Sequence, residues 1–551
     1  MRRICSTACG ILGLCLFLTS ALLADPPAGS DKTKAALALA KRIDEHIAAG
    51  WKAQEVTAAP LADDAEFFRR IHLDIAGRIP VVMDVRDFLA DQRPDKRQRI
   101  IDKLLEGKLK DDGSRDLPAG YIKHFSNVWR REWLPQTLNN PQFQFYGPQF
   151  EGWLQQKLQA NTPYDQLVRS LLTAPLNPQG NGPYDPYSFA ASSFLYVNEM
   201  KPENLGAAAS RLFLGIKIEC AQCHNHPLDK WKREQFWEFA SFFAGFQPIG
   251  QFQRRAPAEQ IEIRSLTIPD LDKKVSAKFL DGKEPKFKDD VSSRFTLVDW
   301  MTAKENPYFA RNAVNRVWNQ FFGNGLIDPI DEPGDQNPPS HPELLEELSK
   351  AFVDSGYDLK FLIRAIVSSQ AYQRSSAAPG ASATTERTFA RMKVRGLTPE
   401  QLFDSLSQAT YFTEDESEEQ RRFGQLGQAR AEFVAKFSST ERPSDLQTSI
   451  LQALTMMNGR FVGVMTSTKF EEIEKKNTRH LLAAIAKADF MSTSDKIEAL
   501  YLATLSRVPR PEEIKKLIEY VDTGGPSGDK NKALADVYWA LLNSSEFGFN
   551  H

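Results

Sequence analysis

Apolar side chains recur at helical spacing along most of this chain. Phe67, Phe68, Ile71 and Ile75 fall on one face when their segment is drawn as a helix. Gly77 follows directly, and a glycine just past the last periodic position is typical of a helix end. This pattern predicts a helix that buries one side and stops at Gly77.

The same periodicity predicts helices elsewhere in both halves of the chain. In Ser340–Glu343 the sequence Ser-His-Pro-Glu has the form of a capping box, which predicts a helix running on to Asp354. The other predicted helices are Val85–Leu89, Ile100–Leu105, Glu203–Leu214, Leu359–Tyr372, Ser494–Ser506, Pro511–Val521 and Lys532–Leu542.

The pattern changes only between residues 248 and 293. Ile261–Ile263 alternates apolar and polar positions, and Asp281-Gly282 is a turn signal of the hairpin type. We therefore predict a mainly α protein, with two helical lobes joined by a short segment that has minor β structure. The expected boundaries are 36–247 for the first helical domain, 248–293 for the connecting segment and 294–551 for the second domain.

The first 24 residues have the form of a secretory signal peptide. Arg2 and Arg3 precede a short apolar run, and small residues stand near its end. The run is too short for a comfortable membrane span, although an uncleaved anchor is the alternative. Export would place the mature chain in the periplasm or at the cell surface. Three of the five cysteines, Cys5, Cys9 and Cys15, would leave with this segment.

Charge and composition narrow the possible partners. Lys and Arg number 69 against 71 acidic residues, and removing Arg2 and Arg3 takes the net charge from −2 to −4. Near balance argues against a nucleic-acid partner or an anionic membrane. No later stretch is long and apolar enough to cross a bilayer, so we expect no stable membrane span in the mature chain.

The two remaining cysteines stand together in the sequence Cys-Ala-Gln-Cys-His at residues 220–224. This spacing is the attachment signature of c-type haem. Thiols three positions apart can add to the two vinyl groups of the porphyrin, and the next residue offers an imidazole to the iron. Cys220 and Cys223 are thus the candidate anchors, and His224 is the candidate proximal ligand.

Two other interpretations of the motif stay open. In an oxidising compartment, Cys220 and Cys223 can close into a small disulfide, which would be structural or active in exchange. Alternatively Cys220, Cys223, His224 and His226 can supply four ligands to zinc or non-haem iron. Neighbouring positions rarely aim four ligands at one tetrahedral centre, which counts against the metal.

A haem protein also needs a second axial position, which decides between electron transfer and small-molecule chemistry. The candidates are Met200, His124, His72 and His341, although each is individually more typical of a structural residue. A run of aromatic residues follows the motif, at Trp231, Phe236, Phe239, Phe242 and Phe243. It would suit the apolar wall of a porphyrin, but ordinary core packing predicts the same residues.

Other chemistry has little support in the sequence. Asp328, Asp331, Glu332 and Asp335 share a loop rich in Pro and Gly, which could bind calcium but is more simply a solvated loop. Arg311, Asn315 and Arg316 share a predicted helix and are expected to form buried ion pairs with such carboxylates. Phosphate-binding glycine loops, nucleophile elbows and the H-E-x-x-H zinc motif are all missing from the sequence, so common hydrolase reactions have no basis.

Several strings resemble two known domain families. Residues 67–74 (FFRRIHLD), 77–80 (GRIP) and 214–227 resemble DUF1549, and residues 306–311, 315–318, 337–344 and 542–551 resemble DUF1553. The pair is typical of exported planctomycete proteins labelled cytochrome-like. The resemblance implies architecture, compartment and possible cell-surface or polysaccharide-related partners, but it implies no reaction.

These observations predict an exported haem c protein with an electron-transfer or other redox role and an unidentified redox partner. A non-haem metal enzyme or sensor is one alternative. A non-catalytic surface or scaffold protein with a structural disulfide is the other. Whether the protein is an enzyme is left open.

Overall fold

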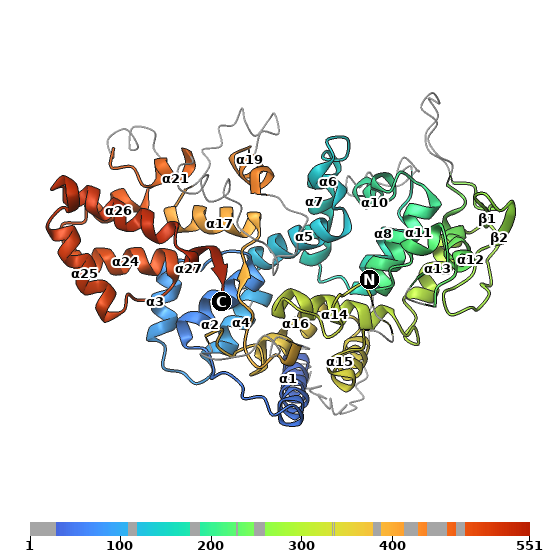
Figure 1. The fold of residues 1–551 in the computed structure, drawn as a ribbon, viewed down its shortest axis with the longest axis horizontal. Coiled ribbons are helices and arrows are strands. Elements are labelled where there is room, and N and C mark those ends of the chain that lie inside the picture. Colours follow the sequence, from blue (N-terminus) through green and yellow to red (C-terminus); the bar gives the residue numbers. More distant parts are fainter. Residues whose placement is uncertain are drawn as a thin grey trace, which may run out of the picture.

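A computed structural model describes most of the chain, and Figure 1 shows its fold. The described residues are 29–107, 118–176, 188–227, 230–246, 259–332, 334, 337–377, 387–412, 428–437, 460–469 and 480–551. The predicted signal peptide, residues 1–24, lies outside them. Within the described ranges no helix is long and apolar enough to span a membrane.

Helices dominate the fold, and the predicted mainly α class with two lobes and minor β structure is confirmed. The helices before the motif are α1 (Gly29–Ala53), α2 (Asp64–Ala76), α3 (Val82–Ala90), α4 (Lys96–Glu106), α5 (Ala119–Trp133), α6 (Gln136–Asn139), α7 (Tyr146–Gln159), α8 (Tyr164–Leu172), α9 (Ser188–Ala191), α10 (Ser193–Val197) and α11 (Pro202–Ala209). A π-helix (Ser210–Leu214), a 3-10 helix (Glu219–Gln222), α12 (Arg233–Ala240) and a second 3-10 helix (Ser241–Phe243) follow.

The second half is built in the same way. Its helices are α13 (Ser293–Met301), α14 (Phe309–Phe322), α15 (Pro342–Asp354), α16 (Leu359–Ser368), α17 (Pro399–Thr410), α19 (Gln428–Phe437), α21 (Arg460–Met465), α23 (Leu481–Ala486), α24 (Thr493–Leu505), α25 (Pro511–Asp522), a 3-10 helix (Gly525–Ser527), α26 (Lys530–Leu542) and α27 (Ser545–Gly548). In Figure 1, α24–α26 form one end of the molecule and α11–α13 lie at the other.

The minor β structure consists of two antiparallel pairs among the described residues. Strands β1 (Ser265–Ile268) and β2 (Lys273–Ser276) pair inside the connecting segment, as a small sheet there was predicted. The predicted turn at Asp281-Gly282 does form, because Gly282 N–H donates to the Phe279 carbonyl at 2.9 Å, but it joins no strands. The other pair, β3 (Arg395–Gly396) with β4 (Phe549–Asn550), links distant parts of the second half.

Most helix ends follow the sequence signals, but the helix predicted over Leu359–Tyr372 ends at Ser368, because the backbone of Ser369 is extended. The α2 helix ends at Gly77, which has φ 71° as expected for a left-handed C-cap. The α15 helix has the predicted extent, but its N-cap is His341 and no side chain caps it. The predicted capping box is therefore wrong: the Ser340 hydroxyl faces the Leu326 carbonyl at 3.3 Å instead of the first turn of the helix.

Two hydrophobic cores hold the helices together. The larger core takes buried side chains from α1 to α16, so it draws on both halves of the sequence. The smaller core lies among α17 and the later helices, and it also receives Leu73 and Ile79 from the first half. The halves are consequently packed into one another, in addition to being connected along the chain.

Buried arginine side chains on α2 add hydrogen bonds between the two halves of the chain. Arg69 donates to the carbonyls of Thr504 (2.8 Å) and Phe547 (2.9 Å), while Arg70 donates to those of Tyr372 (2.8 Å) and His551 (3.0 Å). Both arginines are almost completely buried. A buried guanidinium is tolerated only when its N–H groups find acceptors, so the last residues of the chain complete the environment of α2.

Asp74, also on α2, accepts hydrogen bonds from three side chains of the second half. Arg395 Nη2 lies 2.9 and 3.0 Å from its two oxygens, Tyr372 Oη lies at 2.7 Å, and Asn550 Nδ2 lies at 2.7 Å. Only 1% of Asp74 is exposed. This residue is the centre of a buried polar network that includes both β3 and β4.

Candidate functional site

The Cys-x-x-Cys-His motif follows shortly after the end of a helix. The α11 helix continues as the π-helix, which stops at Gly215 with φ 70°. A Cβ at this position would approach Asn312 Oδ1 to 2.6 Å, so glycine suits both the backbone and the contact. The chain then reaches the 3-10 helix Glu219–Gln222, which carries Cys220, and Cys223 follows at its end.

Both cysteines are exposed to solvent and both are free thiols. Their turn is fixed from behind by α12, because Trp237 Nε1 donates to the Gln222 carbonyl at 3.0 Å and Arg233 Nε donates to it at 3.2 Å. The sulfurs are therefore held on a supported turn and are accessible to a reagent or a cofactor.

The imidazole of His224 is exposed beside them. Its Nδ1 lies 2.7 Å from the Asn225 carbonyl oxygen, which can only accept a hydrogen bond. In the neutral form of the ring, Nδ1 therefore carries the proton and Nε2 keeps its lone pair. In metalloproteins a histidine ligand is commonly oriented by such a bond at its other ring nitrogen.

The aromatic residues after the motif lie in the core. Trp231, Phe236, Phe239, Phe242 and Phe243 are all buried, and they contribute to the larger hydrophobic core. Their contacts are with other protein side chains, such as Phe242 stacking on Phe279 with ring centroids 5.1 Å apart. Core packing thus accounts for this run of residues.

The metal alternative finds no preformed site in the described part of the chain. No three His, Cys, Asp or Glu side chains come together there in a group that could hold a metal ion. His226 is half-buried, and its backbone N–H donates to the Trp231 carbonyl at 2.8 Å. A site made of Cys220, Cys223, His224 and His226 would need the side chains to regroup.

The four candidates for a second axial ligand are all buried: Met200, His72, His124 and His341. His72 is packed against Phe68, and its Nδ1 lies 2.8 Å from the Phe68 carbonyl. His341 packs against Phe389. Burial lowers the pKa of His72, His124 and His341 to about 4 each, so these imidazoles are neutral at ordinary pH.

Two carboxylates of the acidic loop are paired with basic side chains. Asp331 pairs with Arg316, as predicted, and Glu332 pairs with Lys217 at 3.0 Å, whereas Arg311 forms no ion pair with a described residue. Asp335 lies outside the described residues. Because Asp331 and Glu332 are engaged by cations, ion pairing accounts for them without calcium.

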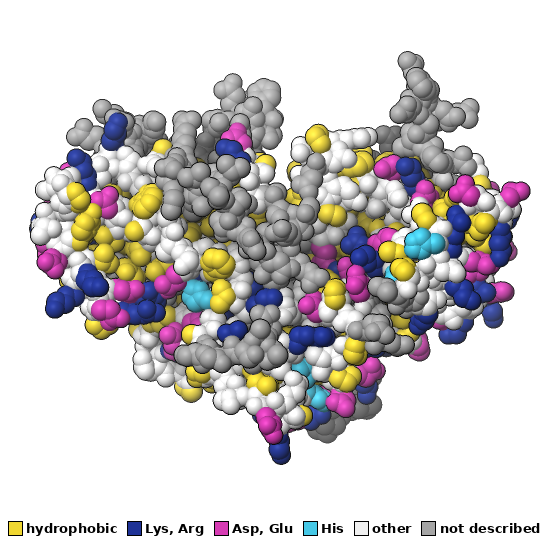
Figure 2. All heavy atoms as spheres, viewed as in Figure 1, with side chains coloured by type: hydrophobic (Ala, Val, Ile, Leu, Met, Phe, Trp, Pro, Cys, Tyr) yellow, Lys and Arg dark blue, Asp and Glu magenta, His cyan; other side chains and the backbone are white. Residues whose placement is uncertain are grey.

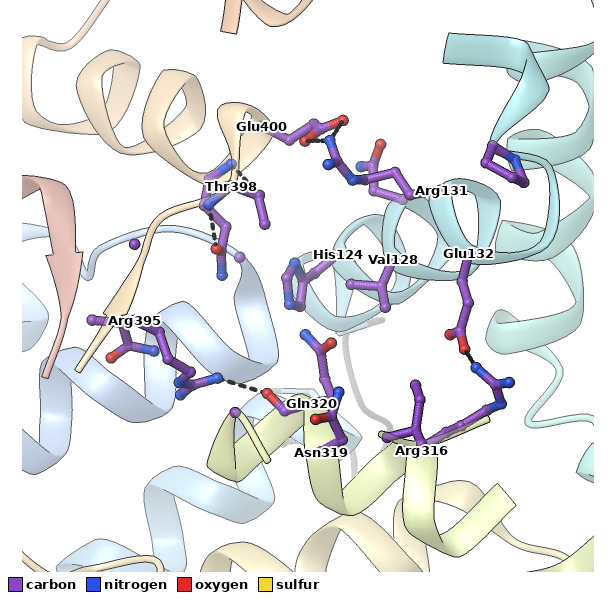
Figure 3. A pocket seen from close by; sticks show the side chains of 18 of the residues that line it. His124, Val128, Arg131, Glu132, Arg316, Asn319, Gln320, Arg395, Thr398 and Glu400 are labelled. Carbon is purple, nitrogen blue, oxygen red and sulfur yellow. Dashed lines mark hydrogen bonds and ion pairs between the residues drawn. The ribbon is translucent and has the colours of Figure 1, made fainter. Parts of the chain in front are cut away.

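A cavity of about 990 Å³ lies beside the motif and is lined by both halves of the chain. We refer to it as the central cavity (Figure 3). Its walls come from the end of α2, from α5, α14 and α17, from β3 and β4, and from the acidic loop. Lys217 and Glu219, which lead directly into Cys220, form part of its wall.

Charged groups line the central cavity, and its acids are all paired. Arg131 lies 2.8 Å from Glu400, Lys123 lies 3.3 Å from Asp404, and Arg211 lies 3.0 Å from Glu219, whose pKa is raised by burial. Arg316 bridges Glu132 and Asp331. Burial alone would raise the pKa of Glu400, but Arg131 and Arg130 hold it below its ordinary value.

His124 projects from α5 into the middle of this space, between the segment that carries Thr398 and the α14 residues Asn319 and Gln320 (Figure 3). Its Nε2 is buried without a hydrogen-bond partner among the described residues. Gly77 closes over the ring, since a Cβ there would stand 2.5 Å from Nδ1. The central cavity thus contains a neutral imidazole with unused hydrogen-bonding capacity.

The sequence indicated His124 only as a candidate haem ligand and did not reveal the cavity. One signal was available: His124, Asn127 and Arg131 are spaced i, i+3 and i+7, which places a polar line on α5. The opposing wall comes from residues that are about 200 to 430 positions later and have no local signature.

Comparisons with known proteins identify domains but no activity. Residues 42–248 match the model of the protein of unknown function DUF1549, and residues 293–521 match the model of the protein of unknown function DUF1553. No curated protein and no solved structure matches the chain.

Proposed function

The chain belongs to the proteins that carry a DUF1549 domain followed by a DUF1553 domain, and from that premise we propose that it is an exported redox protein with one covalently attached haem c. Cys220 and Cys223 would hold the haem, and His224 would be its proximal ligand. Electron exchange with a redox partner would be its role.

One observation carries this proposal: two free thiols and an imidazole with an available Nε2 are exposed together on one supported turn. A disulfide between the sulfurs, or burial of the imidazole, would have left no room for a porphyrin. Each thiol would add across a vinyl group, so that a C–S bond forms and the thiol hydrogen passes to the other vinyl carbon. No oxidant is consumed in this addition and no group leaves.

A bound haem would supply reversible one-electron transfer. The chain's own contribution is to anchor, orient and tune it. The Asn225 carbonyl fixes the His224 ring through Nδ1 and increases the basicity of Nε2. Lys217 and Glu219 place charges at the base of the motif.

The surroundings of the turn favour an exposed haem. The aromatic side chains that follow the motif are already packed inside the core, so they offer no apolar wall at the surface. Solvent exposure is one of the factors that set haem potentials, and water stabilises the more highly charged oxidised form. We therefore expect a reduction potential lower than that of a cytochrome whose haem is buried.

The test is a visible spectrum of the protein produced with haem-maturation machinery in an oxidising compartment. We expect a Soret band that survives denaturation, and a mass increase of one haem that the C220S/C223S variant lacks. The H224A variant should keep the added mass but change the spectrum, because the anchors remain and the ligand is lost. A wild-type protein without Soret absorption would refute the proposal.

The same sample distinguishes the alternatives. Zinc or iron without porphyrin absorption, found by metal analysis, would favour a non-haem metal enzyme or sensor. A mass two hydrogens below that of the dithiol, with no metal, would favour a surface or scaffold protein with a disulfide.

A further inference from the structure

The central cavity contains a specific set of unused binding groups. Its six lining carboxylates are each paired with Arg or Lys. Among the lining cations that the structure describes, Arg78 is the one for which no carboxylate lies within ion-pairing distance, and its side chain is exposed. The cavity therefore presents one uncompensated positive charge.

Buried neutral groups in the same wall also lack partners. Nε2 of His124 and Oδ1 of Asn127 are buried with no hydrogen bond to any described residue, and the two residues are only 6% and 5% exposed. Asn319 Oδ1 is a third such atom. A buried polar atom that lacks a hydrogen bond costs roughly 1–3 kcal/mol, so a ligand that supplies partners gains correspondingly.

The orientation of Asn127 identifies what it needs. Its Nδ2 donates to the Lys123 carbonyl at 2.9 Å, which fixes the amide so that the atom left over is the acceptor Oδ1. An acceptor is satisfied by an O–H or N–H group. His124 can accept or donate through Nε2, because the ring is neutral and Nε2 has no hydrogen bond to a described residue.

All four residues line the same cavity. His124 and Asn127 are three residues apart on α5 and share a face. Gly77 packs close to the imidazole, and the next residue, Arg78, also lines the cavity. Asn319 lines the facing wall on α14 (Figure 3).

We propose that the central cavity binds a small polyhydroxylated monoanion, a hydroxy acid of the sugar-acid type. Arg78 takes the carboxylate, and Asn127, Asn319 and His124 take the hydroxyls. Planar carboxylates suit the guanidinium fork, and several convergent polar groups in a concave site fix the orientation of a small ligand. The site does not depend on haem attachment.

The probes are gluconate, sorbitol and propionate, titrated calorimetrically into the full chain. Sorbitol has the same hydroxylated carbon chain as gluconate without the charge, and propionate has the carboxylate without the hydroxyls. The C220S/C223S variant is used throughout, so that the outcome is separate from the haem question. We expect saturable gluconate binding, at least tenfold weaker sorbitol binding and no saturable propionate binding.

Two variants assign the contacts. Arg78→Gln should reduce gluconate affinity at least tenfold, to the level of sorbitol, and Arg78→Lys should restore part of the loss. Arg86→Gln, which changes an exposed arginine on α3 outside the cavity, is the matched control and should leave affinity unchanged. Asn127→Ala should weaken gluconate and sorbitol alike. Absence of saturable gluconate binding, equal affinity for sorbitol, or unchanged affinity in Arg78→Gln would overturn the proposal.

Discussion

Replacing Asp74 by asparagine should destabilise the whole molecule, because this carboxylate joins the two halves. Three donors converge on its oxygens, from Arg395, Tyr372 and Asn550. An asparagine of the same shape keeps one acceptor oxygen and turns an NH₂ group toward these donors. It also removes the negative charge beside Arg395, of which only 8% is exposed.

These contacts determine the expected loss in the free energy of unfolding. Breaking a buried ion pair by removing one partner costs about 3–5 kcal/mol, since an uncompensated charge remains inside. The loss is a large share of the roughly 5–15 kcal/mol by which proteins are stable. We expect the free energy of unfolding to fall by about 3–5 kcal/mol in Asp74→Asn, measured by urea unfolding followed by tryptophan fluorescence.

The matched control is Asp84→Asn on α3. Asp84 lies 3.2 Å from Lys103, and the two side chains are 36% and 43% exposed. An exposed pair of this kind contributes about 0–1 kcal/mol. The double variant Asp74→Asn/Arg395→Gln should lose less than the sum of its single changes, because the stranded cation is also removed. An Asp74→Asn variant that is no more destabilised than Asp84→Asn would show that the buried carboxylate does not join the two halves.

Three further predictions concern burial and close contact. Gly77→Ala should lower the free energy of unfolding by about 1–2 kcal/mol, because residue 77 has φ 71° and an added Cβ would clash with His124. The control Gly356→Ala should cost less, because Gly356 has φ 75° but a Cβ there would meet nothing within 4 Å. Equal shifts in melting temperature for the two variants would show that the His124 contact adds nothing. Burial lowers the pKa of His72 and His124 from 6.5 to about 4. As the pH falls, the unfolded chain therefore protonates these imidazoles at a higher pH than the folded protein does. The free energy of unfolding should fall between about pH 6.5 and pH 4, by up to about 3 kcal/mol for each imidazole. Urea unfolding of His72→Gln at pH 7 and pH 5 should show a smaller fall than the wild type, and an identical fall would exclude this origin. Trp318→Ala should cost about 3–5 kcal/mol in thermal or urea unfolding, because the indole is fully buried and stacks on Phe322 with centroids 4.3 Å apart, and a loss under about 1 kcal/mol would show that the site collapses.

The sequence predicted local structure well where periodicity and stop signals agree. The helix end at Gly77 and the helix start at Pro511 were both predicted correctly. A left-handed glycine that ends a helix and a proline in its first turn are signals that depend only on neighbouring residues. The capping box at Ser340 was wrong because Ser340 is held by the Leu326 carbonyl, a tertiary contact that no local pattern reveals.

The motif at residues 220–224 could be predicted from the sequence, but the central cavity could not. The thiols and imidazole of residues 220–224 are contiguous, so their clustering could be read directly, and the structure adds their exposure and the orientation of His224. The central cavity depends on residues from distant segments. The burial of Arg69 and Arg70 could not be predicted either, because their acceptors include backbone carbonyls, which leave no trace in the sequence.

The distance spanned by Arg69 has a consequence for how this protein is made. Its guanidinium donates to the Phe547 carbonyl, which lies 478 residues further along the chain. While the polypeptide is being synthesised, α2 therefore emerges with two arginines that it cannot yet bury. We expect the first half, produced alone, to stay aggregation-prone and to require a holding chaperone, and native folding to be completed only after residue 547 has been delivered.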